Sequence, residues 1–131
     1  MFTPIFAKRR AKHLRFGARG ENMACRALQE IGLDIICRNY RVTSGEIDIV
    51  ARDGATVCFV EVKSRRSERY GDPQLAVHAK KQEKMIRTAR HYLAGHGLED
   101  RPARFDVAAI RLSPDGAGAV DLIRNAFELN P

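Results

Sequence analysis

The chain has 131 residues, a length that suits one domain with a single hydrophobic core. Apolar residues make up 44% of it, and no stretch approaches the roughly 18 apolar residues that span a bilayer. Lysine and arginine number 23 against 16 aspartate and glutamate, a formal net charge of +7. This excess favours nucleic acid over a membrane surface as partner, because no long basic amphipathic helix with bulky apolar anchors is present. A simply solvated basic surface is the alternative.

The cysteines and the first residues bear on the compartment. Cys25, Cys37 and Cys58 are far apart, form no CxxC pair and lie among apolar residues. We therefore expect reduced thiols packed in the core, as in a cytoplasmic protein. The apolar start, residues 1–7, is interrupted by Pro4 and is too short for the core of a signal peptide.

The chain opens with a basic segment. Residues 1–16 include Lys-Arg-Arg-Ala-Lys-His and are expected to form a mobile arm ahead of one domain over residues 17–131. A helix is predicted from about Ala18 to Ile31, where apolar residues recur at helical spacing and Gly32 supplies a stop. A strand is predicted over Ile35–Val42.

A β-hairpin is predicted next. Glu46–Arg52 alternates polar and apolar residues, and Thr56–Lys63 is rich in residues that favour strands. Between them, Asp53-Gly54 is a strong signal for a tight turn. The two strands should therefore pair antiparallel.

A polar loop and a second helix follow the hairpin. The loop, Ser64–Pro73, bears several arginines. The helix is predicted over Leu75–Leu93, with Ile86 and Ala89 on its apolar stripe and Gly95 near its end.

Two further strands close the chain. They are predicted at Ala103–Leu112 and Ala119–Phe127, separated by a Ser-Pro-Asp-Gly turn at residues 113–116. The resulting order is αβββαββ. This alternation predicts an α/β fold in which a mixed β-sheet is flanked by helices.

The predicted hairpin brings charged residues together. Side chains two apart on a strand share a face, so Glu46 lies with Asp48 and Glu61 lies with Lys63. A turn made by residues 53–54 would make Asp48 and Glu61 diagonal neighbours, roughly 7–8 Å apart by Cα. A register shifted by two would place them directly opposite. Apolar side chains would fill the other face: Ile47, Ile49, Val60 and Val62.

Two acids that face each other repel unless a cation lies between them. The ordinary alternative is a wet hairpin face on which water screens the repulsion and Lys63 pairs with one acid. The spacing D-x12-E-x-K cannot decide between the two by itself, because such spacings arise easily by chance.

A resemblance to known proteins favours the first reading. Residues 45–51 (GEIDIVA) followed by 59–63 (FVEVK) resemble the D…E-x-K core of the PD-(D/E)XK nuclease superfamily. Over about residues 14–112 the chain resembles the YraN-type family of small bacterial proteins, which is similar to archaeal-type Holliday junction resolvases. The other motifs that carry this resemblance are Gly17-x-x-Gly20-Glu21, Asn39-Tyr40-Arg41, Gly71-Asp72-Pro73, Lys80 to Leu93 and Arg104-Phe105-Asp106-Val107.

The resemblance implies a restriction-endonuclease-like core and metal-dependent endonuclease activity on DNA, with branched or recombination and repair intermediates as substrates. Asp48, Glu61 and the main-chain carbonyl of Val62 would bind Mg²⁺ or Mn²⁺, an ion that keeps several waters. The ion would polarise the scissile phosphate and lower the pKa of a bound water. Lys63 would orient that water or stabilise the transition state. Ile47 replaces the proline of the usual motif, at a position that is variable in the superfamily.

Other residues are candidates for the same site. Glu21 matches a helix-borne acid of the resolvases, although an acid is also favoured by the positive end of any helix. Glu46 could be a further ligand. Lys80 or Gln82 resembles a polar helix residue that many superfamily members place near the metal. Asp106 is expected to be structural and to pair with an arginine.

The basic residues suit a nucleic-acid surface, DNA rather than RNA. Stacking aromatics are absent from the pattern, so contacts to the phosphate backbone should dominate. The candidate contacts are Arg65, Arg66, Arg69, Lys80, Lys81 and Lys84. Two other functions stay open: a non-catalytic nucleic-acid-binding module that retains the fold, and an accessory protein whose acidic hairpin face binds another protein. Resolvase-like relatives act as dimers, so the resemblance leaves a homodimer open.

Overall fold

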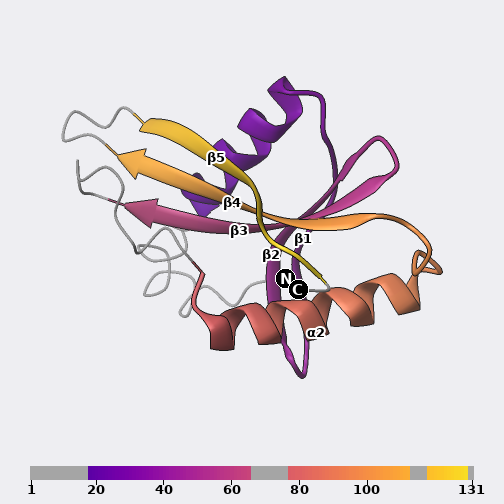
Figure 1. The fold of residues 1–131 in the computed structure, drawn as a ribbon. Helices are drawn as coiled ribbons and strands as arrows, with labels where there is room; N and C mark the ends of the chain where they lie inside the picture. The colour runs from indigo at the N-terminus through magenta and orange to yellow at the C-terminus, as the bar shows by residue number, and fades with distance from the viewer. Residues whose placement is uncertain (1–17, 66–76, 113–117, 130–131) are drawn as a thin grey trace, which may run out of the picture.

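The computed structural model describes residues 18–65, 77–112 and 118–129 (Figure 1). The predicted basic arm, residues 1–16, lies outside the described residues, and so do Arg66 and Arg69. The boundary proposed between arm and domain is therefore still a prediction.

The element order is αβββαββ, which confirms the predicted α/β fold with a mixed sheet. The elements are a helix over residues 18–30, β1 (Asp34–Val42), β2 (Gly45–Asp53), β3 (Thr56–Arg65), α2 (Ala79–Gly95), β4 (Ala103–Leu112) and β5 (Gly118–Phe127).

The strands form one sheet in the order β1-β2-β3-β4-β5. Neighbouring strands are antiparallel except β3 and β4, which are parallel. A parallel pair needs a crossover connection, and α2 lies in that connection. Figure 1 shows α2 against one face of the sheet and the N-terminal helix against the other. The central strands β2 and β3 are therefore covered on both faces.

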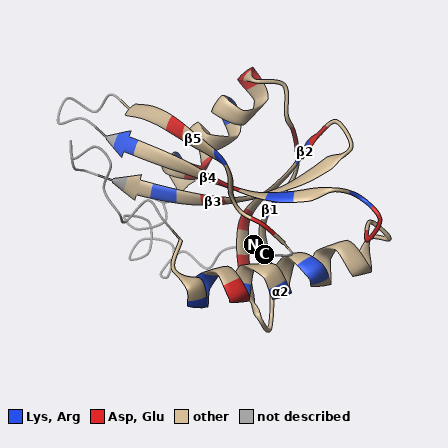
Figure 2. Ribbon diagram, in the orientation of Figure 1, with Lys and Arg blue, Asp and Glu red and all other residues tan. Residues whose placement is uncertain are grey.

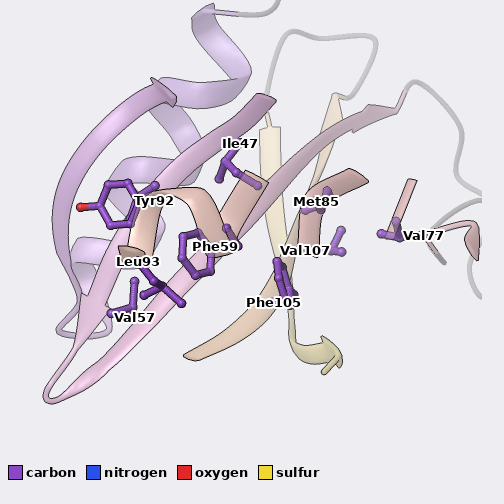
Figure 3. Packing of buried hydrophobic residues seen from close by; sticks show 11 residues of the cluster. Ile47, Val57, Phe59, Val77, Met85, Tyr92, Leu93, Phe105 and Val107 are labelled. Atoms are coloured by element: carbon purple, nitrogen blue, oxygen red, sulfur yellow. The ribbon is translucent and has the colours of Figure 1, made fainter. Parts of the chain in front are cut away.

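Each face of the sheet has its own apolar core. On the α2 side, Phe59 and Phe105 pack with Tyr92 of the helix (Figure 3). On the other side, Leu28 of the N-terminal helix packs with Ile49 of β2. Strands buried on both faces carry nearly continuous apolar runs, and this explains residues 57–60 of β3.

The prediction of a hairpin with one polar and one apolar face was therefore wrong. Ile47 belongs to the α2-side core, whereas Ile49 and Val60 belong to the core under the N-terminal helix. Both faces are apolar over most of the hairpin, so Asp48 and Glu61 are partly enclosed rather than fully solvated.

The turn of the hairpin also differs from the prediction. Asp53 pairs with Thr56, so the turn consists of Gly54 and Ala55 rather than Asp53 and Gly54. Gly54 has φ 59°, a left-handed conformation that glycine adopts without strain, and it takes the first turn position. The change shifts the register by two residues, which is the alternative that places position 48 across from position 61.

Helix α2 starts later than predicted. Val77 and His78 are not helical, and His78 is extended with φ −64° and ψ 153°. The buried positions of α2 are Met85, Thr88, Ala89, Tyr92 and Leu93, while the predicted stripe residue Ile86 is only partly buried. No helix in the described ranges is long and apolar enough to cross a membrane.

Candidate metal and nucleic-acid site

Asp48 lies where β2 and β3 separate. Regular pairing between these strands runs only as far as Ile49 opposite Val60. Beyond that point the Asp48 side chain replaces a main-chain acceptor: the main-chain N–H of Val62 donates to its Oδ2 at 2.8 Å. The carboxylate is thus fixed between two strands at the edge of the core.

Glu61 faces Asp48 from β3 and is almost completely buried, with 6% of its surface exposed. Its neighbours Val60 and Val62 pack under the N-terminal helix, so by strand alternation Glu61 points toward α2. There the Nζ of Lys81 contacts its Oε1 at 2.5 Å. Lys63 follows on the same face of β3 and is partly buried.

The pKa of Asp48 is unusually high for a carboxylate. The pKa of Asp48 is raised from 3.8 to about 7, first by burial and then by the negative charge of Glu61, whereas the hydrogen bond from Val62 lowers it. Glu21 and Glu46 also raise this pKa. The acids predicted for the site therefore do act on one another electrostatically.

The N-terminal helix carries Glu21 to this cluster. A Cβ at Gly20 would lie only 2.8 Å from Oγ of Ser64, so the missing side chain permits close approach of the helix to β3. Oε1 of Glu21 accepts hydrogen bonds from Arg38 at 3.3 Å and from Nδ2 of Asn39 at 3.2 Å. These contacts hold the helix acid against β1, next to the site.

Asn39 has a special backbone position. Arg38 pairs with Ile49 and Tyr40 with Ile47, so Asn39 lies across from Asp48 on the neighbouring strand. Its φ is 55°, in the left-handed region that asparagine tolerates better than most residues. In the motif Asn39-Tyr40-Arg41, the left-handed residue is therefore also the one that donates to Glu21.

The remaining acid and helix candidates make their direct contacts with other residues. Glu46 pairs with Arg41 at 3.2 Å, and 37% of its side chain is exposed. Gln82 does not turn to the acids: its Nε2 donates to the carbonyl of Val77 at 2.7 Å. Lys80 is exposed. The helix residue that reaches the acids is Lys81, which sequence reasoning had placed only on the nucleic-acid surface.

A sequence signal for Lys81 existed. It precedes Met85 by four residues and Thr88 by seven, and both are buried on the sheet-facing side of α2. Residues at these spacings lie on one helix face. A stripe centred on Met85 and Thr88 rather than Ile86 would have directed Lys81 toward the sheet.

The oxygen atoms at this site are of the kind that a cation such as Mg²⁺ prefers as ligands. Between described residues, hydrogen bonds to the two acids use Oδ2 of Asp48 and Oε1 of Glu61, and the second oxygen of each acid could bind an ion. An extended residue directs its N–H and C=O to the same side, so the Val62 carbonyl faces the side of Asp48. Among the described residues, no three His, Cys, Asp or Glu side chains are close enough to hold a metal. An ion here would depend on two carboxylates, the Val62 carbonyl and water.

Asp106 is structural, as predicted. It is 2% exposed and accepts hydrogen bonds at 3.1 Å from Nε of Arg104 and at 2.9 Å from the main-chain N–H of Asn125. Arg104 also contacts Asp53 at 2.9 Å. The cluster ties β5 and the β2–β3 turn to β4.

The basic candidates on α2 form an exposed stripe. Lys80, Lys84 and Arg87 are exposed and recur at spacings of three and four, so they lie on one face of the helix. Basic residues of α2 are coloured blue in Figure 2. The side chain of Arg65 lies outside the described side chains, like Arg66 and Arg69.

Comparisons with known proteins bear on the family. A model of the uncharacterised protein family UPF0102 matches residues 20–110. A UPF0102 protein of Syntrophus aciditrophicus is 50% identical over 121 residues, which is 92% of this chain and 94% of that protein. Another, from Geobacter sulfurreducens, is 52% identical over 114 residues, or 86% and 88% of the two chains.

Among solved structures, SfsA of Pyrococcus furiosus in complex with Ca²⁺ aligns over 86% of this chain with a TM-score of 0.41 and 17% identity. The chain spans 63% of the length of that protein. The family match, in contrast, covers most of the chain and includes both strands that carry the acids. The chain therefore belongs to UPF0102, the YraN-type family, which is nuclease-like and of the PD-(D/E)XK type.

Proposed function

We propose that this protein is a metal-dependent endonuclease that hydrolyses phosphodiester bonds in DNA. The observation that carries the proposal is the pair of shielded carboxylates, Asp48 and Glu61, at the point where two strands separate. Burying two acids side by side destabilises a fold unless a cation compensates them. The raised pKa of Asp48 reports that cost.

The roles of the residues follow from their positions. Asp48, Glu61 and the Val62 carbonyl would bind Mg²⁺ or Mn²⁺, whose chemistry is to polarise a phosphate and to lower the pKa of a bound water. Lys63 shares the face of Glu61 and would orient the attacking water or stabilise charge on the phosphate. Glu21, held by Arg38 and Asn39, would add negative potential beside Asp48.

DNA is proposed as the substrate because of the cationic surface next to the acids. Lys80, Lys84 and Arg87 form an exposed stripe on the helix that delivers Lys81 to Glu61. Phosphate contacts made by such a stripe would position the protein on the DNA backbone without reading its sequence. Tyr40 and Tyr92 pack edge to face with each other, so they do not form a stacking platform for bases. Recognition of backbone shape suits branched DNA, and a homodimer would suit a symmetric junction.

A second candidate is a non-catalytic nucleic-acid-binding module. It is favoured by one observation: within the described ranges, no three metal-binding side chains gather at one point. In such a protein the Lys81–Glu61 ion pair would simply neutralise a buried acid, and the basic stripe alone would carry the function.

Cleavage assays on several DNA structures separate the two candidates. Duplex, single-stranded, flapped and four-way DNA are incubated with the protein and Mg²⁺ or Mn²⁺. The nuclease is expected to cut at least one substrate, and Asp48→Asn should abolish cutting while DNA binding persists. Asp34→Asn is the matched control, since Asp34 is an exposed acid on β1 with 74% of its side chain in solvent. Binding without cutting of any substrate supports the module.

A further inference from the structure

Lys81 holds a position that none of the nuclease motifs gives it. Its ammonium is bonded to Oε1 of Glu61, the acid of the E-x-K motif. The contact joins α2 to β3 and lies on the opposite side of Glu61 from the N-terminal helix. Lys81 is therefore a direct neighbour of the candidate metal ligands.

The phase of α2 directs Lys81 to this acid. Met85 and Thr88 lie on the buried face of the helix, and Lys81 precedes them by four and seven residues. Its side chain therefore starts from the sheet-facing side and reaches Glu61, although about half of it is exposed. The ion pair therefore results from the position of Lys81 on the helix, and not only from the attraction between Glu61 and the many basic residues of α2.

The two partners differ in their freedom to move. The side chain of Glu61 is 8% exposed, whereas that of Lys81 is 52% exposed. Moving Glu61 would disturb the packed sheet. The Lys81 ammonium can rotate into water without opening the core, because its long stem is flexible.

The ammonium of Lys81 contacts one of the two acids, Glu61, and Lys63 lies on the same face of β3. A divalent ion bound by Glu61 would compete with the Lys81 ammonium for the same carboxylate. Two cations held by one carboxylate also repel each other.

We propose that Lys81 is a displaceable counter-ion of the metal site: it neutralises Glu61 when no metal is bound and leaves that carboxylate when a divalent ion binds. The inference deepens the proposed function and rests on it only for the identity of the cation. The displaced ammonium remains beside the basic stripe of α2, where a substrate phosphate would meet it. Lys81 thus occupies Glu61 as an ion-pair partner before the metal arrives.

The test measures Mn²⁺ affinity in the absence of DNA, by electron paramagnetic resonance of free Mn²⁺. Lys81→Met removes the charge and keeps an unbranched side chain. Removal of one competing charge is expected to tighten Mn²⁺ binding about 5- to 10-fold. Lys80→Met is the matched control, because it deletes the same charge from the adjacent exposed position, and its effect should stay below about twofold. Lys81→Gln serves as a second variant, and thermal melts verify that each protein is folded.

The sign of the change decides the question. If Lys81 only held Glu61 in place, its loss would loosen a ligand and weaken Mn²⁺ binding. Equal or weaker binding by folded Lys81→Met, or an equal gain in Lys80→Met, would overturn the inference.

Cleavage is scored separately. Wild-type protein that binds Mn²⁺ but cuts no substrate overturns the endonuclease and leaves Lys81 as the counter-ion. Cutting by wild type with unchanged Mn²⁺ affinity in Lys81→Met overturns the counter-ion role and leaves the endonuclease. Wild type that binds no Mn²⁺ overturns both.

Discussion

Val62 donates its main-chain N–H to the carboxylate of Asp48 at 2.8 Å, across the point where β2 and β3 cease to pair. A side chain therefore replaces a main-chain acceptor in the ladder. The bond fixes Asp48 in a partly enclosed position opposite Glu61. It also aligns the Val62 carbonyl with the same side of the strand, so one local distortion brings together all the atoms proposed to bind a cation.

The first prediction concerns pH and stability in metal-free buffer. The native pKa of Asp48, about 7, lies above the ordinary 3.8, so the native state binds the proton more tightly than the unfolded state does. The stability from this group is fully present below pH 3.8 and is lost as pH rises through about 7. The difference between a pKa of 3.8 and one of about 7 corresponds to an upper limit of about 4 kcal/mol.

Asp48→Asn should abolish this loss, because an amide does not ionise and can still accept from Val62. At pH 8 with a chelator, the variant should unfold at a higher urea concentration than wild type, by up to that limit. At pH 4 the difference should largely disappear. Asp34→Asn, at an exposed position, should show no such pH-dependent gain. A variant less stable than wild type at pH 8 would contradict the assigned burial cost.

The second prediction concerns metal binding to the folded protein. A ligand that binds only the native state stabilises it by about 2.7 kcal/mol at 100 times its Kd. Mg²⁺ or Mn²⁺ should therefore raise the melting temperature of wild type in a concentration-dependent way. Glu61→Gln should lose most of that rise, because it removes one of two acidic ligands. Calorimetry with and without metal measures the effect, and an equal rise in the variant would place the metal elsewhere.

The fold could be predicted because its signals are local. Helical spacing between Ala24 and Leu28, the glycine after the first helix and the strand-rich segments gave the correct order of elements. The faces of the hairpin could not be predicted in the same way. Ile47 and Ile49 look like one apolar face in the sequence, but they lie in different cores, on either side of Asp48 where the pairing of β2 with β3 ends.

The candidate site was predictable only in part. The positions of Asp48 and Glu61 followed from the D…E-x-K spacing, although the register depended on which residues form the turn. Lys81 was missed because its contact depends on the phase of α2 against the sheet, a property of tertiary packing. The hydrogen bond from Asn39 to Glu21 comes from a residue whose backbone is in the left-handed conformation, and the strand pattern of the sequence does not reveal such a conformation.

The third prediction tests this left-handed position. Asn39→Ala should destabilise the protein by about 1–3 kcal/mol, because alanine tolerates positive φ poorly and the hydrogen bond to Glu21 is lost. Asn39→Gly keeps the backbone free and should lose only the hydrogen bond, about 0.5–1.5 kcal/mol. Asn125, with φ 53°, is the matched control position.

At position 125 the main-chain N–H, not the side chain, makes the bond to Asp106. Asn125→Gly should therefore be nearly neutral, while Asn125→Ala should again be destabilised by strain. Free energies of unfolding from urea titration give all four values. If Asn39→Gly were as neutral as Asn125→Gly, the bond from Asn39 would contribute nothing to holding Glu21.

The fourth prediction concerns the basic stripe of α2. Each lysine that neutralises a phosphate releases counterions from DNA, so binding should fall steeply as salt rises. Lys80→Met and Lys84→Met should each lower the slope of log K against log salt by about 0.9 for duplex DNA, with similar effects on all sequences. Fluorescence anisotropy at several salt concentrations, with a chelator present to prevent cutting, measures the slopes.

Arg52→Met is the matched control for the stripe. Arg52 is also an exposed cation, but it lies at the turn end of β2 and pairs with Asp34. Its loss should leave the slope unchanged, because the proposed phosphate contacts lie on α2 near Asp48 and Glu61. A wild-type slope close to zero would remove nucleic acid as the partner. An equal loss of slope in all three variants would show that net charge, and not the stripe, attracts the DNA.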